Sequence, residues 1–157
     1  MSFEISYDAI LARFDDLVAR KAIHYAPRST VQLEDDGFAL EFHISTSLSQ
    51  KPQDGYPVCG HDDPTSEKPE CFGLGSDIGN GDPGVLIEAI HKTHVLVFDK
   101  FCIFRPQLLL LTSDSYRRQR EPLALDDLAV ACTVMTCLNR PLFPIYNCGP
   151  IAGEQTA

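Results

Sequence analysis

The stretch that decides the fold reads His94-Val-Leu-Val-Phe-Asp-Lys-Phe-Cys-Ile-Phe-Arg-Pro-Gln-Leu-Leu-Leu-Leu-Thr112. Its apolar runs at 95–98 and 108–111 predict two strands, although leucine-rich runs also occur in helices. Continuous apolar runs indicate strands that are covered on both faces. Pro106 lies between the runs, where its missing N–H interrupts no ladder. Strands that follow each other without an intervening helix favour an antiparallel sheet, so we expect an α+β fold, mostly antiparallel sheet with flanking helices.

The amino-terminal side of this stretch predicts a helix and then a strand. Residues 8–24 carry apolar side chains at helical spacing, and Asp8 is the expected N-cap. Residues 38–44 alternate between apolar and other side chains, which is typical of a half-buried strand. Asp35, Asp36 and Gly37 predict the turn before it.

The regions on either side of the central stretch differ sharply in composition. Residues 50–84 are rich in Pro, Gly, Asp and Ser, and they predict a long irregular loop. After the stretch, apolar residues recur at helical spacing and predict a second helix, with Asp126 and Asp127 in its first turn. The predicted apolar positions of that helix are Leu125, Leu128, Cys132, Met135 and Leu138.

Composition indicates one globular domain over residues 1–157. The net charge of −9, from 13 basic and 22 acidic residues, argues against binding to nucleic acid, which requires many cations. We see no signal peptide and no apolar run long enough to span a membrane, so a cytoplasmic protein is expected. Six cysteines without a secretory signal are expected to be reduced and mostly buried: Cys59, Cys71, Cys102, Cys132, Cys137 and Cys148.

The spacing of residues gives little support to a zinc site, a nucleophilic cysteine or a phosphate-binding glycine loop. Cysteine and histidine residues at 59, 61, 71, 91 and 94 match no usual zinc pattern, so incidental residues are favoured. Cys102 and Cys148 have no visible base partner, which disfavours a nucleophilic role. The glycines at 73, 75, 79, 81 and 84 lack the Gly-Lys-Ser/Thr sequence of a P-loop, and a flexible loop is favoured.

Two lysines are better candidates because of where they fall. Lys51 closes the stretch Ser45-Thr-Ser-Leu-Ser-Gln-Lys-Pro52, and Lys100 directly follows an apolar strand. A lysine beyond a strand end can project toward a phosphate as a point charge. Taken alone, each is more readily explained as a solvated surface lysine.

Four stretches, in this order and spacing, resemble the diadenosine tetraphosphate phosphorylase (ATP adenylyltransferase) family. They are Phe42-His-Ile-Ser-Thr-Ser-Leu-Ser-Gln-Lys-Pro52, the central stretch 94–112, Gln119-Arg-Glu-Pro-Leu-Ala-Leu-Asp-Asp-Leu128, and Tyr146-Asn-Cys-Gly-Pro-Ile-Ala-Gly153. The resemblance covers roughly residues 8–153, the amino-terminal portion of that family.

The resemblance implies a histidine-triad-like fold and phosphorolysis of dinucleoside polyphosphates through a nucleotidyl-histidine intermediate. Its implied partners are an adenine (di)nucleotide and phosphate. Lys51 would contact substrate phosphate, and Asp99 with Lys100 would occupy the family's Asn-Lys substrate-binding pair. Asn147 would bind nucleotide, and Gly153 would begin a phosphate-cradling loop. The resemblance implies no certain cofactor, and a divalent metal that accompanies the nucleotide stays open.

Two departures limit what the resemblance implies. Asp99 replaces the usual Asn, and its carboxylate would repel an anion unless it is paired. The family continues beyond the position of Gly153 to a His-x-His-x-Gln motif that supplies the nucleophile, and no such motif occurs in this sequence. We therefore expect a truncated member that is inactive by itself. The alternatives are a non-catalytic nucleotide-binding module and a protein-interaction or oligomerisation domain, since exposed apolar surface would favour self-association.

Overall fold

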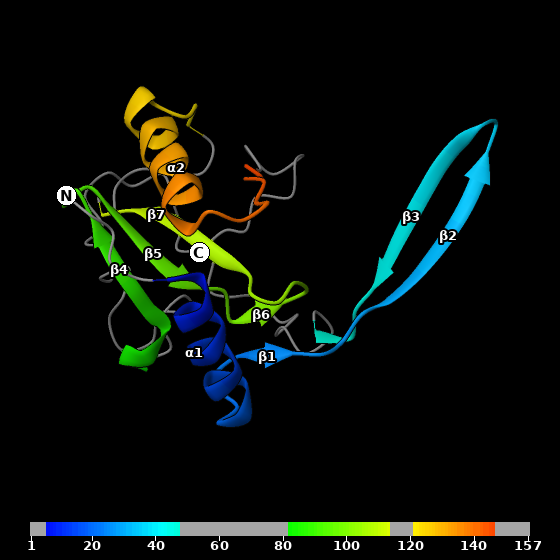
Figure 1. Cartoon of the computed structure of the whole chain (residues 1–157), viewed down its shortest axis with the longest axis horizontal. Coiled ribbons are helices and arrows are strands. Elements are labelled where there is room, and N and C mark those ends of the chain that lie inside the picture. Colours follow the sequence, from blue (N-terminus) through cyan, green and yellow to red (C-terminus); the bar gives the residue numbers. More distant parts are fainter. Residues whose placement is uncertain (1–5, 48–81, 114–120, 147–157) are drawn as a thin grey trace, which may run out of the picture.

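The computed structural model describes residues 6–47, 82–113 and 121–146. The order of elements is α1 (Tyr7–Ala19), β1 (His24–Tyr25), β2 (Ser29–Asp35), β3 (Phe38–Ile44), η2 (Pro83–Val85), β4 (Leu86–Ile90), β5 (His94–Phe98), β6 (Phe101–Cys102), β7 (Leu108–Thr112) and α2 (Leu125–Leu138). Figure 1 shows a body built from helices and sheet, from which the β2–β3 hairpin projects. Neither described helix has the length and hydropathy of a membrane span.

The central sheet confirms the expectation drawn from residues 94–112. β5 pairs antiparallel with β7, from His94 opposite Thr112 to Phe98 opposite Leu108. β4, which the sequence analysis missed, pairs antiparallel on the other side of β5. Leu96 and Val97 point to opposite faces and are both buried, so β5 is covered on both sides as predicted. β7 is only half-buried along its length. The α+β class with mostly antiparallel sheet is confirmed.

Helix α1 differs at both ends from the predicted helix. Its N-cap is Ser6, whose Oγ accepts a hydrogen bond from the Ala9 N–H at 3.2 Å, so the assignment of Asp8 as N-cap was wrong. Asp8 lies in the first turn instead. The helix ends at Ala19 and not at His24, because Lys21 adopts a left-handed conformation with φ 61° that ends the helical path.

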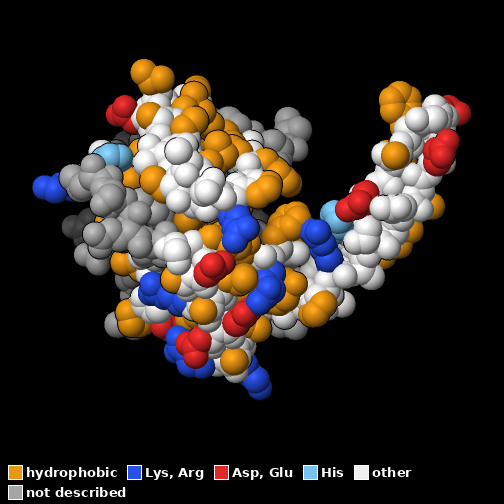
Figure 2. Space-filling model, viewed as in Figure 1, with side chains coloured by type: hydrophobic (Ala, Val, Ile, Leu, Met, Phe, Trp, Pro, Cys, Tyr) orange, Lys and Arg blue, Asp and Glu red, His pale blue; other side chains and the backbone are white. Residues whose placement is uncertain are grey.

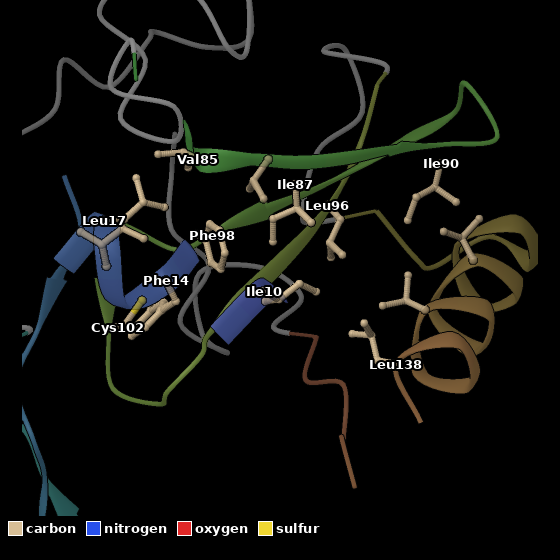
Figure 3. Close-up of a cluster of buried hydrophobic side chains, with 14 residues drawn as sticks. Ile10, Phe14, Leu17, Val85, Ile87, Ile90, Leu96, Phe98, Cys102 and Leu138 are labelled. Carbon is tan, nitrogen blue, oxygen red and sulfur yellow. The ribbon is translucent and has the colours of Figure 1, made fainter. Parts of the chain in front are cut away.

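The main core is formed by the helices and the central sheet. α1 contributes Ile10, Phe14 and Leu17, which recur at helical spacing and are almost fully buried. Figure 3 shows these side chains converging with Ile87 and Leu96 and with others from β4 and β5, while Leu138 of α2 joins the same cluster.

Helix α2 occupies the predicted range, but its buried face was predicted wrongly. The buried residues are Asp127, Val130, Val134 and Leu138. Of the predicted apolar positions, Leu125, Leu128 and Cys132 are exposed and only Leu138 is buried. The helix is apolar on nearly all sides, so spacing alone did not identify the side that faces the core.

The position of α2 is fixed by a buried polar contact with β5. His94 Nε2 lies 2.9 Å from Asp127 Oδ1, and both residues are buried. Asp127 Oδ2 accepts a hydrogen bond from the Ala124 N–H at 2.6 Å, and His94 Nδ1 lies 3.0 Å from Thr93 Oγ1. The carboxylate therefore joins the start of α2 to the first residue of β5.

The β2–β3 hairpin, here called the arm, was only half predicted. The strand at 38–44 is confirmed, and so is the turn at Asp36 and Gly37. Asp35, predicted in that turn, instead ends the partner strand β2, which was missed. The prediction of a half-buried strand was wrong, because every residue of β2 and β3 is exposed. Within the described part of the chain, the two strands pair only with each other.

Candidate functional site

The turn that follows β5 contains the predicted pair Asp99 and Lys100. Asp99 directs its carboxylate into the turn, where Oδ1 accepts a hydrogen bond from the Phe101 N–H at 3.0 Å. Oδ2 accepts another from the side-chain amide of Gln107, and the backbone N–H of Asp99 donates to the Gln107 carbonyl at 3.1 Å. Asp99 thus closes the turn between β5 and β7, with both carboxylate oxygens hydrogen-bonded to the protein itself.

Lys100 is half-buried and lies beside an aromatic ring. Its ammonium nitrogen is 5.5 Å from the centroid of the Phe101 ring. Its carbonyl accepts a hydrogen bond from the His24 N–H at 2.7 Å, which joins the turn to β1. The His24 ring also stacks on Phe101, with centroids 5.1 Å apart and planes 7° apart. In the described ranges no carboxylate forms an ion pair with the Lys100 ammonium group.

The segment that leads to Lys51 meets this same turn. Ser47 is buried at the end of that segment's described part, and its hydroxyl donates to the Cys102 carbonyl at 2.6 Å. The Ser45 hydroxyl lies 2.7 Å from that of Ser47 and steadies the segment. Lys51, four residues further along the sequence, lies outside the described residues. The structure therefore places Ser47, four residues before Lys51, against Cys102, two residues after Lys100, which sequence spacing did not show.

The carboxy-terminal candidates Asn147 and Gly153 also lie outside the described residues. Their immediate neighbour Tyr146 is described, and its hydroxyl donates to the Glu121 carbonyl shortly before α2. No described contact joins this position to Lys100.

The structure also locates several of the weaker candidates. Burial raises the pKa of the Cys102 thiol, and the charge of Asp99 raises it further, so this thiol is a poor nucleophile. Its S–H donates to the Asp99 carbonyl at 2.9 Å. Cys132 and Cys137 are exposed, so the expectation of mostly buried cysteines was wrong for the three described ones. Cys59, Cys71 and Cys148 lie outside the described residues, as does most of the 50–84 loop.

Two of the remaining weak candidates, His94 and Gly84, have structural partners, whereas His91 is exposed. His94 is engaged with Asp127 and Thr93, and the described residues contain no group of three potential ligands that could hold a metal ion. Gly84, the one described member of the glycine-rich loop, donates its N–H to Asp82 Oδ1 at 2.7 Å within η2. It therefore belongs to a capped turn next to β4.

A second group of basic and aromatic side chains lies at the base of the arm. The guanidinium carbon of Arg28 is 4.8 Å from the centroid of the Phe104 ring, and the His43 ring meets Phe104 edge-on. Sequence reasoning missed Arg28, Phe104 and His24. Their partners are distant in the sequence, so no local pattern indicated the contacts.

Comparison with known proteins supports the resemblance seen in the sequence. The chain is similar in structure to yeast Ap4A phosphorylase Apa2 in complex with Ap4A, with a TM-score of 0.66 at 20% sequence identity. That match covers 96% of this chain and 47% of the yeast chain, so this chain spans about half the length of that relative. At this identity the likeness shows the fold, and it fits the histidine-triad-like fold expected above.

No curated protein sequence matches the chain. The family model described as the Ap4A phosphorylase N-terminal domain matches residues 9–156. Because this match extends over nearly the whole sequence, the chain belongs to the Ap4A phosphorylase N-terminal domain family.

Proposed function

We propose that this chain supplies part of the nucleotide-binding surface of an enzyme that splits dinucleoside polyphosphates with inorganic phosphate. The observation that carries the proposal is the position of Lys100 in a domain of this family. Its side chain is half-buried beside Phe101 and forms no ion pair with a described carboxylate. Ser47, four residues before Lys51, donates a hydrogen bond to Cys102, two residues after Lys100.

A half-buried lysine with no acidic partner among the described residues favours an anionic ligand. Removing an ammonium group from water costs free energy, and an opposite charge or an aromatic face offsets part of that cost. In the described structure the Phe101 ring supplies the aromatic face. A phosphate oxygen would supply the missing negative charge, which makes phosphate the ligand class that this environment suits best.

The hydrogen bonds of the Asp99 carboxylate reduce its repulsion of a phosphate ligand. Both oxygens accept hydrogen bonds from the turn itself, one from the Phe101 N–H and one from Gln107. N–H donors that point at a carboxylate partly offset its negative charge. We therefore assign Asp99 the role of shaping the turn that presents Lys100, and Lys100 the role of contacting phosphate.

The family resemblance implies ligand contacts for three further residues, Lys51, Asn147 and Gly153. Lys51 would contact phosphate from the segment anchored by Ser47. Asn147 would bind the nucleotide, and Gly153 would begin the phosphate-cradling loop. The yeast relative was solved in complex with Ap4A, which supports an adenine dinucleotide as the ligand to test first.

Isothermal titration of the purified chain with a nonhydrolysable diadenosine tetraphosphate analogue tests this proposal. The titration is made at low salt, with and without magnesium, because exposed phosphate contacts are screened by salt. Lys100→Gln removes the charge but keeps a long side chain, and it should weaken binding by about tenfold, the loss of one charge-assisted contact.

Lys92→Gln is the matched control. Lys92 lies in the β4–β5 turn, at the opposite end of β5 from Lys100, and its side chain is exposed. It should bind like the unchanged chain. Equal affinities for the Lys100 and Lys92 variants, or no binding by a demonstrably folded chain, would refute the assignment of Lys100.

A second candidate function, an oligomerisation domain, is favoured by one specific observation. The arm exposes an apolar face that no described element covers.

A further inference from the structure

The arm has two chemically different faces. Residues directly opposite each other in its ladder share a face, so Val31 lies beside Phe42 and Leu33 beside Leu40. Strand alternation places Phe38 and Ile44 on this face as well, with Asp35 opposite Phe38 at the tip and Ser29 opposite Ile44 at the base. These six large apolar side chains are each between 39% and 72% exposed. The other face carries Thr30, Gln32, Glu34, Ala39, Glu41 and His43.

An isolated two-stranded hairpin is at best marginally stable in water and gains its stability from a covered apolar face. Figure 1 shows the arm projecting away from the body, and Figure 2 shows hydrophobic side chains exposed along it. The exposed apolar face measures on the order of 600 Å², which is the upper range for a patch on a monomeric protein. A surface of this kind indicates a binding partner.

We propose that the apolar face of the arm binds the same face of a second copy of this chain in a two-fold symmetric dimer. Two such faces together would bury about 1,200 Å², which is the lower limit for specific protein interfaces. The polar faces, with Glu34 and Glu41, would point outward into solvent on opposite sides of the dimer. A two-fold contact of one patch with itself closes after two copies.

The charges of the arm favour one relative direction of the two arms in the dimer. Asp35 and Asp36 lie at the tip, and Arg28 lies at the base. Arms that ran in the same direction would bring the acidic tips together. Antiparallel arms separate the tips by the length of the strands, about 24 Å for seven residues, which exceeds the Debye length in physiological salt. Each acidic tip then lies near the end that carries Arg28.

Helix α2 presents the main rival surface. Leu125 and Leu128 on its outer side are 80% and 50% exposed. That helix, however, already packs its buried face against the core through Val130, Val134 and Leu138. Among the described residues, no part of the body covers the apolar face of the arm, so covering that face is worth more to the folded chain.

Analytical ultracentrifugation over a hundredfold range of protein concentration tests the proposal. The unchanged chain should show a reversible equilibrium between monomer and dimer. Leu33→Lys places a charge on the apolar face and should raise the dissociation constant by at least about tenfold, as expected for a central interface residue. Phe42→Lys, on the neighbouring strand and the same face, should do the same.

Gln32→Lys is the matched control, because it introduces the same side chain one position away on the opposite face. It lies directly opposite Glu41, so the new charge is paired and the arm is not weakened. Its dissociation constant should stay within about twofold of the unchanged chain, well below the roughly thirtyfold effects that mark interface hot spots. Equal thermal midpoints for all variants would show that the body remains folded.

Three results would overturn the proposal. One is a chain that stays monomeric at every concentration, which would assign the arm to a different polypeptide. Another is a dimer that Leu33→Lys and Gln32→Lys affect equally. The third is association that is lost in Leu128→Lys but kept in Leu33→Lys, which would place the interface on α2.

Discussion

The buried contact between Asp127 and His94 gives the most direct test of how α2 is held on the sheet. Asp127→Ala would leave the buried His94 ring nitrogen without its partner, and it would remove the acceptor of the Ala124 N–H at the exposed start of α2. Each unsatisfied buried group costs about 1–3 kcal/mol, and loss of a helix cap costs about 1 kcal/mol. We therefore expect the free energy of unfolding to fall by about 2–4 kcal/mol, the sum of one unsatisfied buried group and one lost cap.

The assay is urea unfolding at neutral pH, followed by circular dichroism, together with amide hydrogen exchange. For a chain of this size, a loss of 3 kcal/mol corresponds to a drop of about 6–12 °C in Tm. Exchange should accelerate first in α2, because the contact joins that helix to β5. Asp126→Ala is the control, since Asp126 is exposed in the same helical turn and contributes at most about 1 kcal/mol through the helix dipole. A loss below 1 kcal/mol for Asp127→Ala would refute the reasoning.

Three further predictions follow from the core, the surface and the sequence. Phe14→Ala should lower the free energy of unfolding by about 3–5 kcal/mol, because Phe14 is fully buried, whereas an equal midpoint in urea would contradict that burial. A hydrogen bond from Arg105 lowers the pKa of exposed Asp15, so the small stability loss in Arg105→Gln should be present at neutral pH and vanish in acid as Asp15 protonates. The purified polypeptide should bind dinucleotide without phosphorolysis, since its sequence contains no His-x-His-x-Gln motif, and turnover detected by chromatography would contradict this.

The Asp15–Arg105 pair stabilises the fold at neutral pH and not in acid because the folded state lowers the pKa of Asp15. A carboxyl group whose pKa is lower in the folded state stabilises the fold above its unfolded pKa. That stabilisation is lost as the pH falls through the folded-state value. Asp15 and Arg105 are both about half exposed, so solvent screens their interaction and the effect is modest.

The candidate site was predictable in part. Lys100 was selected as a candidate from the sequence because a cation directly follows an apolar strand. The structure shows its side chain half-buried beside Phe101. The role of Asp99 within the turn depended on Gln107, eight residues later in the sequence, which no local rule connects to it. The contact of Ser47 with Cys102 depended on β6, a strand of two residues that forms only through its pairing with β1.

The sequence by itself determined the strands β5 and β7, the helices α1 and α2 in outline, the α+β class and the family resemblance. Apolar runs, helical spacing and turn residues act over a few positions, so they can be read along the chain. Only the tertiary structure decided which side of α2 is buried and that the alternating strand β3 stands in solvent. Alternation shows that two faces of a strand differ, but whether a face is buried depends on distant segments that must reach it.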